Sequence, residues 1–172
     1  MVVGDGAVGL CAVIAAKEMG AERIIAMSRH ESRRQLAREF GATDIVTERG
    51  EEGVARIKDL TDGIGADAVL ECVGTAQAMQ QALHSARPGG NVGFVGVPHE
   101  VRIDGRELFL SHVGLRGGPA PVRRYLPDLV GRVLSGRINP GRVFDLTLPL
   151  EQVAQGYKAM DERLAIKTLL KP

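Results

Sequence analysis

The chain has 172 residues, of which 44% are hydrophobic and 25% are charged. This composition is typical of a folded globular protein and excludes a disordered or fibrous chain, and the length suits one domain, with or without a small appendage. Because 22 basic residues balance 21 acidic ones and leave a formal net charge of +1, the protein has no strong field toward nucleic acid or an anionic membrane. We therefore expect neither as a partner.

The two cysteines, Cys11 and Cys72, are too few for a metal cluster or a disulfide framework. We interpret both as reduced side chains that fill apolar space. No apolar run approaches about 18 residues, the length that spans a bilayer. The N-terminal residues also lack a basic leader with a small-residue cleavage site. A cytoplasmic location is expected.

Short apolar runs alternate with helix-like stretches along most of the chain, and Gly, Pro or Asp separates them. The predicted strands are Met1–Val3, Arg23–Met27, Asp44–Thr47, Ala68–Val73, Asn91–Val97 and Val113–Arg116. The predicted helices are Ala7–Met19, Ser32–Phe40, Gly53–Leu60, Ala76–Ala86 and Val122–Leu134. The alternation predicts an α/β fold with a doubly wound parallel sheet of six strands, in two βαβαβ halves that meet near residues 63–67.

Four residues mark predicted helix ends. Gly20, Gly41 and Gly136 stand where a left-handed residue closes a helix, and Thr75 stands where it can cap the helix that follows. From Val143 onward the pattern changes to a strand, an amphipathic helix and a second strand. We interpret this part as an appendage to the sheet, so the predicted domains are residues 1–142 and 143–172.

A glycine-rich loop, GDGAVG at residues 4–9, follows the first predicted strand and opens the first helix. In this context its G-x-G-x-x-G spacing is typical of a Rossmann dinucleotide-binding fold. Gly4 permits the tight turn, Gly6 lets the backbone approach a pyrophosphate, and Gly9 lets the helix pack against the strand. We predict that these glycines, with Ala7 and Val8, bind the cofactor; a purely structural glycine turn is the alternative.

The choice between NAD and NADP depends on the end of the second strand, where an Asp or Glu binds the adenosine ribose of NAD. Ser28 stands at that position, Arg29 follows it, and two further arginines, Arg33 and Arg34, come a turn later. NADP is favoured, because a hydroxyl and the forked donors of a guanidinium suit a 2′-phosphate. The alternatives are that the arginines form only a solvated helix face and that Glu31 reaches a ribose hydroxyl of NAD.

The later strands end in small or apolar residues, namely ECVG at 71–74, FVGVP at 94–98 and RGG at 116–118. Since the carboxyl ends of parallel strands line the ligand crevice, we expect the nicotinamide half of the cofactor near Cys72, Val73, Val95, Gly96, Val97 and Arg116. Ordinary strand-ending turns are the alternative. The four histidines are scattered without a metal-binding spacing. We therefore predict no catalytic and no metal-binding residue in this chain.

Taken together, GDGAVG, ECVG, the RPGG turn at 87–90, FVGVP, RGG and the ending LPLEQVAQGYKAMDERLAIKTLLKP resemble the C-terminal half of the zinc-type medium-chain alcohol dehydrogenases. The resemblance covers essentially the whole chain. It implies that Val95 and Val97 lie near the nicotinamide, and that Leu115 and Arg116 flank the same pocket. It also implies that Lys167 reaches the pyrophosphate.

The same resemblance implies a function, hydride transfer between an alcohol and NADP, with a small alcohol or carbonyl compound as substrate. In that family a GroES-like catalytic domain with the zinc ligands precedes the nucleotide domain, and residues 143–172 would return to it. This sequence begins inside the first strand of the nucleotide domain, so we expect zinc only in the missing domain and expect the chain alone to be inactive. Residues 101–110 would help form a subunit interface, which implies a homodimer or a tetramer.

Two other functions are compatible with a glycine-rich first turn. One is a stand-alone, non-catalytic nucleotide-binding or redox-sensing module. The other is a methyltransferase, which is disfavoured because no acidic residue ends the second strand.

Overall fold

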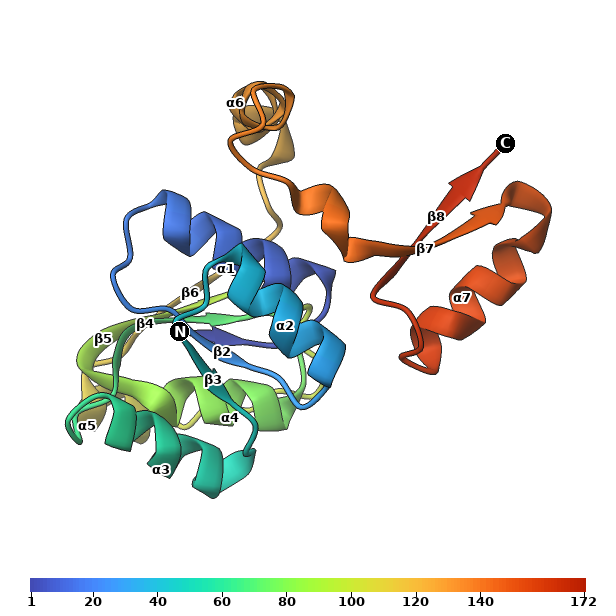
Figure 1. Ribbon diagram of the computed structural model, residues 1–172. Coiled ribbons are helices and arrows are strands. Elements are labelled where there is room, and N and C mark those ends of the chain that lie inside the picture. Colours follow the sequence, from blue (N-terminus) through green and yellow to red (C-terminus); the bar gives the residue numbers. More distant parts are fainter. The chain divides into compact units, whose positions relative to one another are not determined.

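The computed structural model describes the whole chain, residues 1–172, as two compact units, Met1–Ala120 and Pro121–Pro172. The first unit holds a six-stranded parallel sheet in the order β3-β2-β1-β4-β5-β6 (Figure 1). Its strands are β1 Val2–Val3, β2 Ile25–Met27, β3 Asp44–Val46, β4 Ala66–Glu71, β5 Ala86–Phe94 and β6 Gly114–Gly117. The predicted α/β fold with a doubly wound sheet is confirmed, and its halves meet between β1 and β4.

Helices cover both faces of this sheet (Figure 1). On one face lie α1 and α2, and on the other lie α3, α4 and α5. This arrangement follows from right-handed crossovers, because the chain moves outward from β1 to β3 and then returns to run from β4 to β6 in the opposite direction. The helices are α1 Ala7–Glu18, α2 Glu31–Phe40, α3 Gly50–Leu60, α4 Ala76–Ser85 and α5 Gly105–Ser111.

The central strands are apolar on both sides because both faces of the sheet are covered. Val2 and Val3 of β1 point to opposite faces, yet they are only 1% and 2% exposed. One core lies between the sheet and the helices α3 and α4, and its buried members are Val3, Ile25, Met27, Val46, Ile57, Ala66, Val69, Ala78, Met79, Ala82, Leu83, Ala86, Val92 and Val113. On the other face α1 buries Leu10, Val13 and Ile14. This packing holds β1 and the loop that follows it in place.

The predicted helix ends are confirmed. Gly20, Gly41 and Gly136 all have positive φ angles, of 82°, 117° and 73°. Thr75 is the N-cap of α4, and its hydroxyl oxygen accepts a hydrogen bond from the Ala78 amide at 3.2 Å. These local signals stop and start helices because they satisfy backbone groups that a helix leaves without partners.

Two elements differ from the sequence prediction. No helix is predicted between β5 and β6, but α5 forms there, capped by the Asp104 carboxylate, which accepts a hydrogen bond from the Arg106 amide at 2.8 Å. Its seven residues are too few to show a clear helical period. The turn predicted at 87–90 lies inside β5, because Ala86 pairs with Ala66 and Asn91 pairs with Ala68. Residues 87–90 thus stand opposite residue 67 alone, as an irregularity of the strand.

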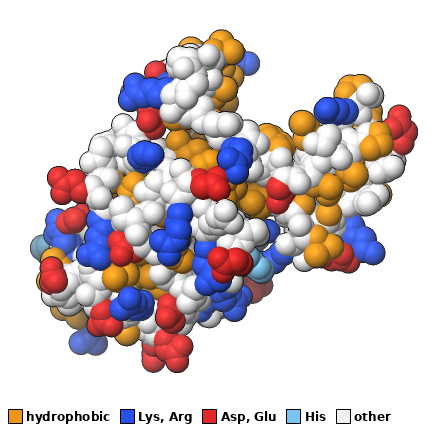
Figure 2. Space-filling view, in the orientation of Figure 1, with side chains coloured by type: hydrophobic (Ala, Val, Ile, Leu, Met, Phe, Trp, Pro, Cys, Tyr) orange, Lys and Arg blue, Asp and Glu red, His pale blue; other side chains and the backbone are white.

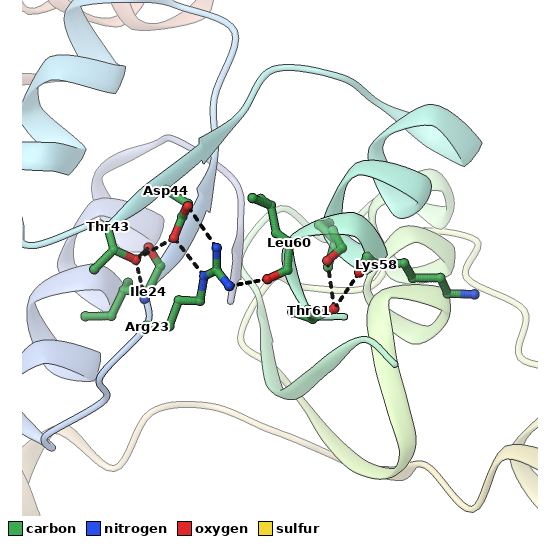
Figure 3. A network of polar contacts seen from close by, with 8 residues as sticks. Arg23, Ile24, Thr43, Asp44, Lys58, Leu60 and Thr61 are labelled. Carbon is green, nitrogen blue, oxygen red and sulfur yellow. Dashed lines mark hydrogen bonds and ion pairs between the residues drawn. The ribbon is translucent and has the colours of Figure 1, made fainter. Parts of the chain in front are cut away.

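Arg23 joins the amino ends of β2 and β3 to the end of α3 (Figure 3). Its Nε and Nη2 atoms donate to the Asp44 carboxylate at 3.0 and 3.2 Å, and its Nη1 atom donates to the Leu60 carbonyl. The Thr43 hydroxyl also donates to Asp44, at 2.8 Å. The hydrogen bond from Arg23 is the main reason why the pKa of Asp44 is lowered. This network lies at the amino ends of the strands, so it supports the end of the sheet opposite the glycine-rich loop.

The second unit contains α6 (Val122–Leu134) and a strand–helix–strand element. The strands β7 (Phe144–Pro149) and β8 (Lys167–Lys171) pair in parallel, with α7 (Val153–Asp161) between them, as predicted. Short 3-10 turns precede β7 at Pro140–Val143 and follow it at Leu150–Gln152. The Asp145 carboxylate accepts a hydrogen bond from the Ile166 amide at 2.8 Å and so joins the two strands.

The division between the compact units falls between residues 120 and 121, because α6 groups with the later elements. The predicted domain boundary at residues 142 and 143 differs from this division and stays a prediction.

No helix of the chain is both long and apolar enough to cross a membrane. On the face of the first unit shown in Figure 2, acidic and basic side chains are interspersed.

Candidate functional site

The candidate site lies at the carboxyl ends of the strands in the first unit. There β1 pairs with both β2 and β4, so the strand order reverses next to it. Crossover helices leave in opposite directions at such a point, which opens a crevice where ligands of open α/β sheets bind. The loop after β1 is the glycine-rich loop, residues 4–9.

The three glycines of this loop have different surroundings. Gly4 has a φ of +114°, and a Cβ on it would lie 2.9 Å from Cγ2 of Val73, in the loop after β4. A Cβ on Gly9 would lie 2.0 Å from the Gly4 carbonyl oxygen, so only glycine lets α1 pack this closely on the turn. A Cβ on Gly6 would meet nothing within 4 Å. Gly4 and Gly9 therefore serve the packing of the loop, whereas the space above Gly6 is open.

The N-terminus of α1 faces this open space without a cap of its own. Gly6 is the N-cap, no side chain caps the helix, and its first turn holds no acidic residue. The first amide groups of a helix lack partners within the helix and carry its positive dipole end, so they attract an anion. Ala7 is half-buried and Val8 is 57% exposed beside them. An uncapped, uncharged helix start beside an open glycine fits a pyrophosphate.

The ends of β4 and β5 lie against each other, backbone to backbone. A Cβ on Gly74 would lie 2.3 Å from the Val97 carbonyl oxygen, and one on Gly96 would lie 2.3 Å from the Gly74 amide nitrogen. The buried Glu71 holds the first of these loops, because its Oε1 atom accepts hydrogen bonds from the Val73 and Gly74 amides at 2.7 and 2.8 Å.

This contact leaves three valines at the carboxyl ends of the strands. Val73 is 47% exposed, Val95 is 50% exposed and Val97 is 71% exposed. Such exposure of apolar side chains is compatible with a flat ring that would cover them. Gly96 between the latter two is partly buried against the Gly74 backbone.

Cys72 is partly buried in the same turn. Burial, and then the neighbouring charge of Glu71, raise the pKa of the Cys72 thiol to about 12. Burial also raises the pKa of Cys11. A thiol with such a pKa stays protonated near neutral pH and is a poor nucleophile. Cys72 is therefore unsuited to act as a nucleophile near neutral pH.

At the end of β2 the structure reveals a contact that sequence reasoning missed. The Ser28 hydroxyl donates to Oδ2 of Asp5 at 2.8 Å, and the Arg33 guanidinium lies 3.4 Å from Oδ1 of the same carboxylate. Arg29, in contrast, is exposed. The predicted phosphate contact of Ser28 stays a prediction, and it would require this hydroxyl to turn away from Asp5. The only signal for Asp5 in the sequence is a charged residue between two glycines of the loop.

The remaining predicted residues lie farther along the chain. Leu115 and Arg116 are in β6, where they pair with Val92 and Gly93; Leu115 is partly buried and Arg116 is exposed. Lys167 is the first residue of β8, in the second unit, and it is exposed. The roles of all three at a cofactor stay predictions.

The chain holds no group of three or more His, Cys, Asp or Glu side chains that could bind a metal ion. Three or four such side chains are needed to hold zinc in a protein. The residues of this chain therefore fit a dinucleotide at the glycine loop but do not fit a zinc ion.

Comparisons with known proteins identify the family of this chain. A sequence model of the family described as zinc-binding dehydrogenase matches residues 7–130. The chain is 40% identical over 159 residues to a protein of Mycobacterium tuberculosis named "Probable zinc-binding alcohol dehydrogenase", covering 91% of this chain and 40% of that protein. It is 34% identical over 175 residues to an L-threonine 3-dehydrogenase of Bacillus licheniformis, covering 99% and 50%. The chain thus spans about half the length of the curated relatives it matches.

Solved structures give the same result. The alcohol dehydrogenase TADH from Thermus sp. ATN1 superposes with a TM-score of 0.89 at 36% identity, over 98% of this chain and 50% of that one. The resemblance inferred from the sequence motifs is confirmed. Because the family model matches most of its length, from the glycine loop through β6 into α6, this chain belongs to the zinc-binding dehydrogenase family.

Proposed function

We propose that this chain is the cofactor-binding portion of an NADP-dependent zinc-type alcohol dehydrogenase, which transfers a hydride between an alcohol and the cofactor. One observation carries the proposal: the space above Gly6 is open, at the uncapped N-terminus of α1 and beside the point where the strand order reverses. A nicotinamide dinucleotide supplies the hydride chemistry when it is bound. The chain's own residues would bind and orient it.

The proposed roles follow the position of each residue along the crevice. The first amides of α1 would hold the pyrophosphate. The exposed side chains of Val73, Val95 and Val97 would support the nicotinamide, with Leu115 and Arg116 flanking it. Lys167 would add a positive charge at the pyrophosphate. The protonated Cys72 thiol would only fill space beside the ring. We propose residues 1–142 as the dinucleotide domain and residues 143–172 as a segment of the catalytic domain.

Gly6→Ala tests the pyrophosphate site. The added methyl would occupy the open space without touching the protein, so we expect an unchanged fold and an affinity for NADPH and NADH that falls about tenfold or more. Gly105→Ala is the matched control, because a Cβ there also meets nothing within 4 Å. The measurement is calorimetric titration of the full chain. Equal affinities of the two variants would place the pyrophosphate elsewhere, and absence of binding by the unsubstituted chain would refute the function.

We base the proposed preference for NADP on Arg29, which is exposed at the end of β2 and would bind a 2′-phosphate there. NAD is the alternative cofactor; Glu31, which would serve it, is in an ion pair with Arg34. Arg29→Glu should lower or invert the preference for NADPH over NADH. If the ratio of the two affinities does not change, the 2′-phosphate is not at Arg29.

We propose alcohol dehydrogenase activity for the complete enzyme and not for this chain alone. We expect the 172-residue chain to bind cofactor but not to oxidise simple alcohols above background, because its residues form no zinc site.

We also propose a homodimer or a tetramer, supported by Phe109 and Leu110 of α5, which are 76% and 70% exposed. Sedimentation velocity tests this, and a monomer at micromolar concentration would contradict it.

A further inference from the structure

A carboxylate is present at the end of β2 although no acidic residue stands there in the sequence. Ser28 occupies the position where an Asp or Glu is expected in NAD-binding sheets. In space, however, the carboxylate of Asp5 from the glycine loop lies within 2.8 Å of the Ser28 hydroxyl. The acid is therefore supplied by a residue 23 positions earlier in the chain.

This carboxylate is buried and its charge is compensated. Asp5, Ser28 and Arg33 are only 8%, 1% and 7% exposed. Besides its contact with Oδ1 of Asp5, Nη1 of Arg33 lies 3.5 Å from the backbone carbonyl of Asp5. The three side chains come from the glycine loop, the end of β2 and the first turns of α2. A buried pair of this kind is costly to desolvate and is weak evidence for a role in stability alone.

We propose that Asp5 and Arg33 are positioning residues that leave the cofactor preference to Arg29, because as a compensated pair they add no net charge at the adenosine end of the site. This inference rests on the proposed function. Because the two charges cancel, the choice between a 2′-hydroxyl and a 2′-phosphate falls to the exposed Arg29. An uncompensated charge at this place would act on the 2′-phosphate, which NADPH has and NADH lacks.

The two members of the pair should then have opposite effects on selectivity. Arg33→Met leaves a buried carboxylate that repels a phosphate, whereas Asp5→Asn leaves a guanidinium that attracts one. The double variant removes both charges and should resemble the unsubstituted protein. A merely structural role would weaken the binding of NADPH and NADH alike, so the ratio of their affinities separates the two explanations.

The experiment is calorimetric titration of the full chain and of the three variants with NADPH and with NADH. We expect the preference for NADPH to rise about threefold to tenfold in Asp5→Asn, to fall by a similar factor in Arg33→Met, and to stay within about twofold of the original in the double variant. Asp5→Ser and Arg33→Gln are prepared alongside, and circular dichroism selects the variants that fold.

An unchanged ratio in folded single variants would overturn the inference while leaving the proposed function intact, since both cofactors would still bind. Shifts of the same sign in both single variants would also overturn it. If every single variant is unfolded and the double variant is folded, the pair is purely structural and the inference fails. If the unsubstituted chain binds neither cofactor, the proposed function itself fails.

Discussion

Gly6 and Gly9 belong to one loop, yet a side chain would have different effects at the two positions. A Cβ on Gly6 enters open space, and a Cβ on Gly9 would lie 2.0 Å from the Gly4 carbonyl oxygen and 2.7 Å from its carbon. The same substitution therefore tests ligand binding at one position and packing at the other.

We expect Gly9→Ala to lower the free energy of unfolding by about 1–3 kcal/mol, because the added methyl forces α1 away from the turn. Urea denaturation followed by circular dichroism measures this. Gly6→Ala is the matched control and should unfold near the urea concentration of the unsubstituted chain. Equal midpoints for the two variants would contradict the packing role of Gly9.

The end of β2 marks a limit of residue-level prediction. Their position after the second predicted strand identifies Ser28 and Arg29, and the structure places both at that strand's end. The contact of Ser28 with Asp5 could not be predicted, because it depends on how the loop after β1 turns toward β2.

At the scale of elements, Arg23 connects two strands with a helix at the amino ends of the strands, opposite the glycine-rich loop (Figure 3). Its hydrogen bond to Asp44 lowers the pKa of that carboxyl in the folded state. A group with a lowered folded pKa contributes stability above its unfolded pKa, about 3.9 for Asp, and loses this contribution as the pH falls toward the folded value.

We therefore expect Asp44→Asn to lower the thermal unfolding temperature by a constant amount between about pH 7 and pH 5, and by a shrinking amount below about pH 4. Differential scanning calorimetry across this range measures the difference. Asp59→Asn, on an exposed residue of α3, should show little effect at any pH. A difference for Asp44→Asn that persists unchanged at pH 2.5 would contradict the assignment.

Elements with a clear period or a cap were predictable from the sequence. The helix α6 has the bounds that the pattern predicts, Val122–Leu134, and Thr75 caps α4 as expected. The short α5 and the irregular start of β5 were missed. The first has too few residues for a period, and the second depends on pairing with β4, which no local pattern encodes.

At the scale of the whole molecule, all six strands of the sheet and all members of the core cluster lie within Met1–Ala120. Because the first unit holds the whole sheet and its core, we expect it to fold without α6, which groups with the later elements. The predicted domain boundary at residue 142 instead assigns α6 to the dinucleotide domain. The two divisions can be compared directly with fragments.

We expect residues 1–120 to unfold cooperatively and to bind NADPH within about tenfold of the full chain's affinity, because the residues proposed to bind the cofactor are all present except Lys167. Thermal circular dichroism and calorimetric titration measure both properties, with residues 1–142 as the comparison. A folded fragment 1–142 beside an unfolded fragment 1–120 would instead support the boundary at residue 142.

The order of the elements, the parallel sheet, the glycine loop and the family follow from the sequence alone, because periodicity, caps and glycine spacing are local properties. Which distant residues meet depends on the three-dimensional packing. It brought Gly74 against Gly96 and Val97, left the space above Gly6 open, and joined Asp5 to Ser28 and Arg33. Such contacts depend on strand register and on the path of each loop, which the backbone adopts only when the whole sheet is packed.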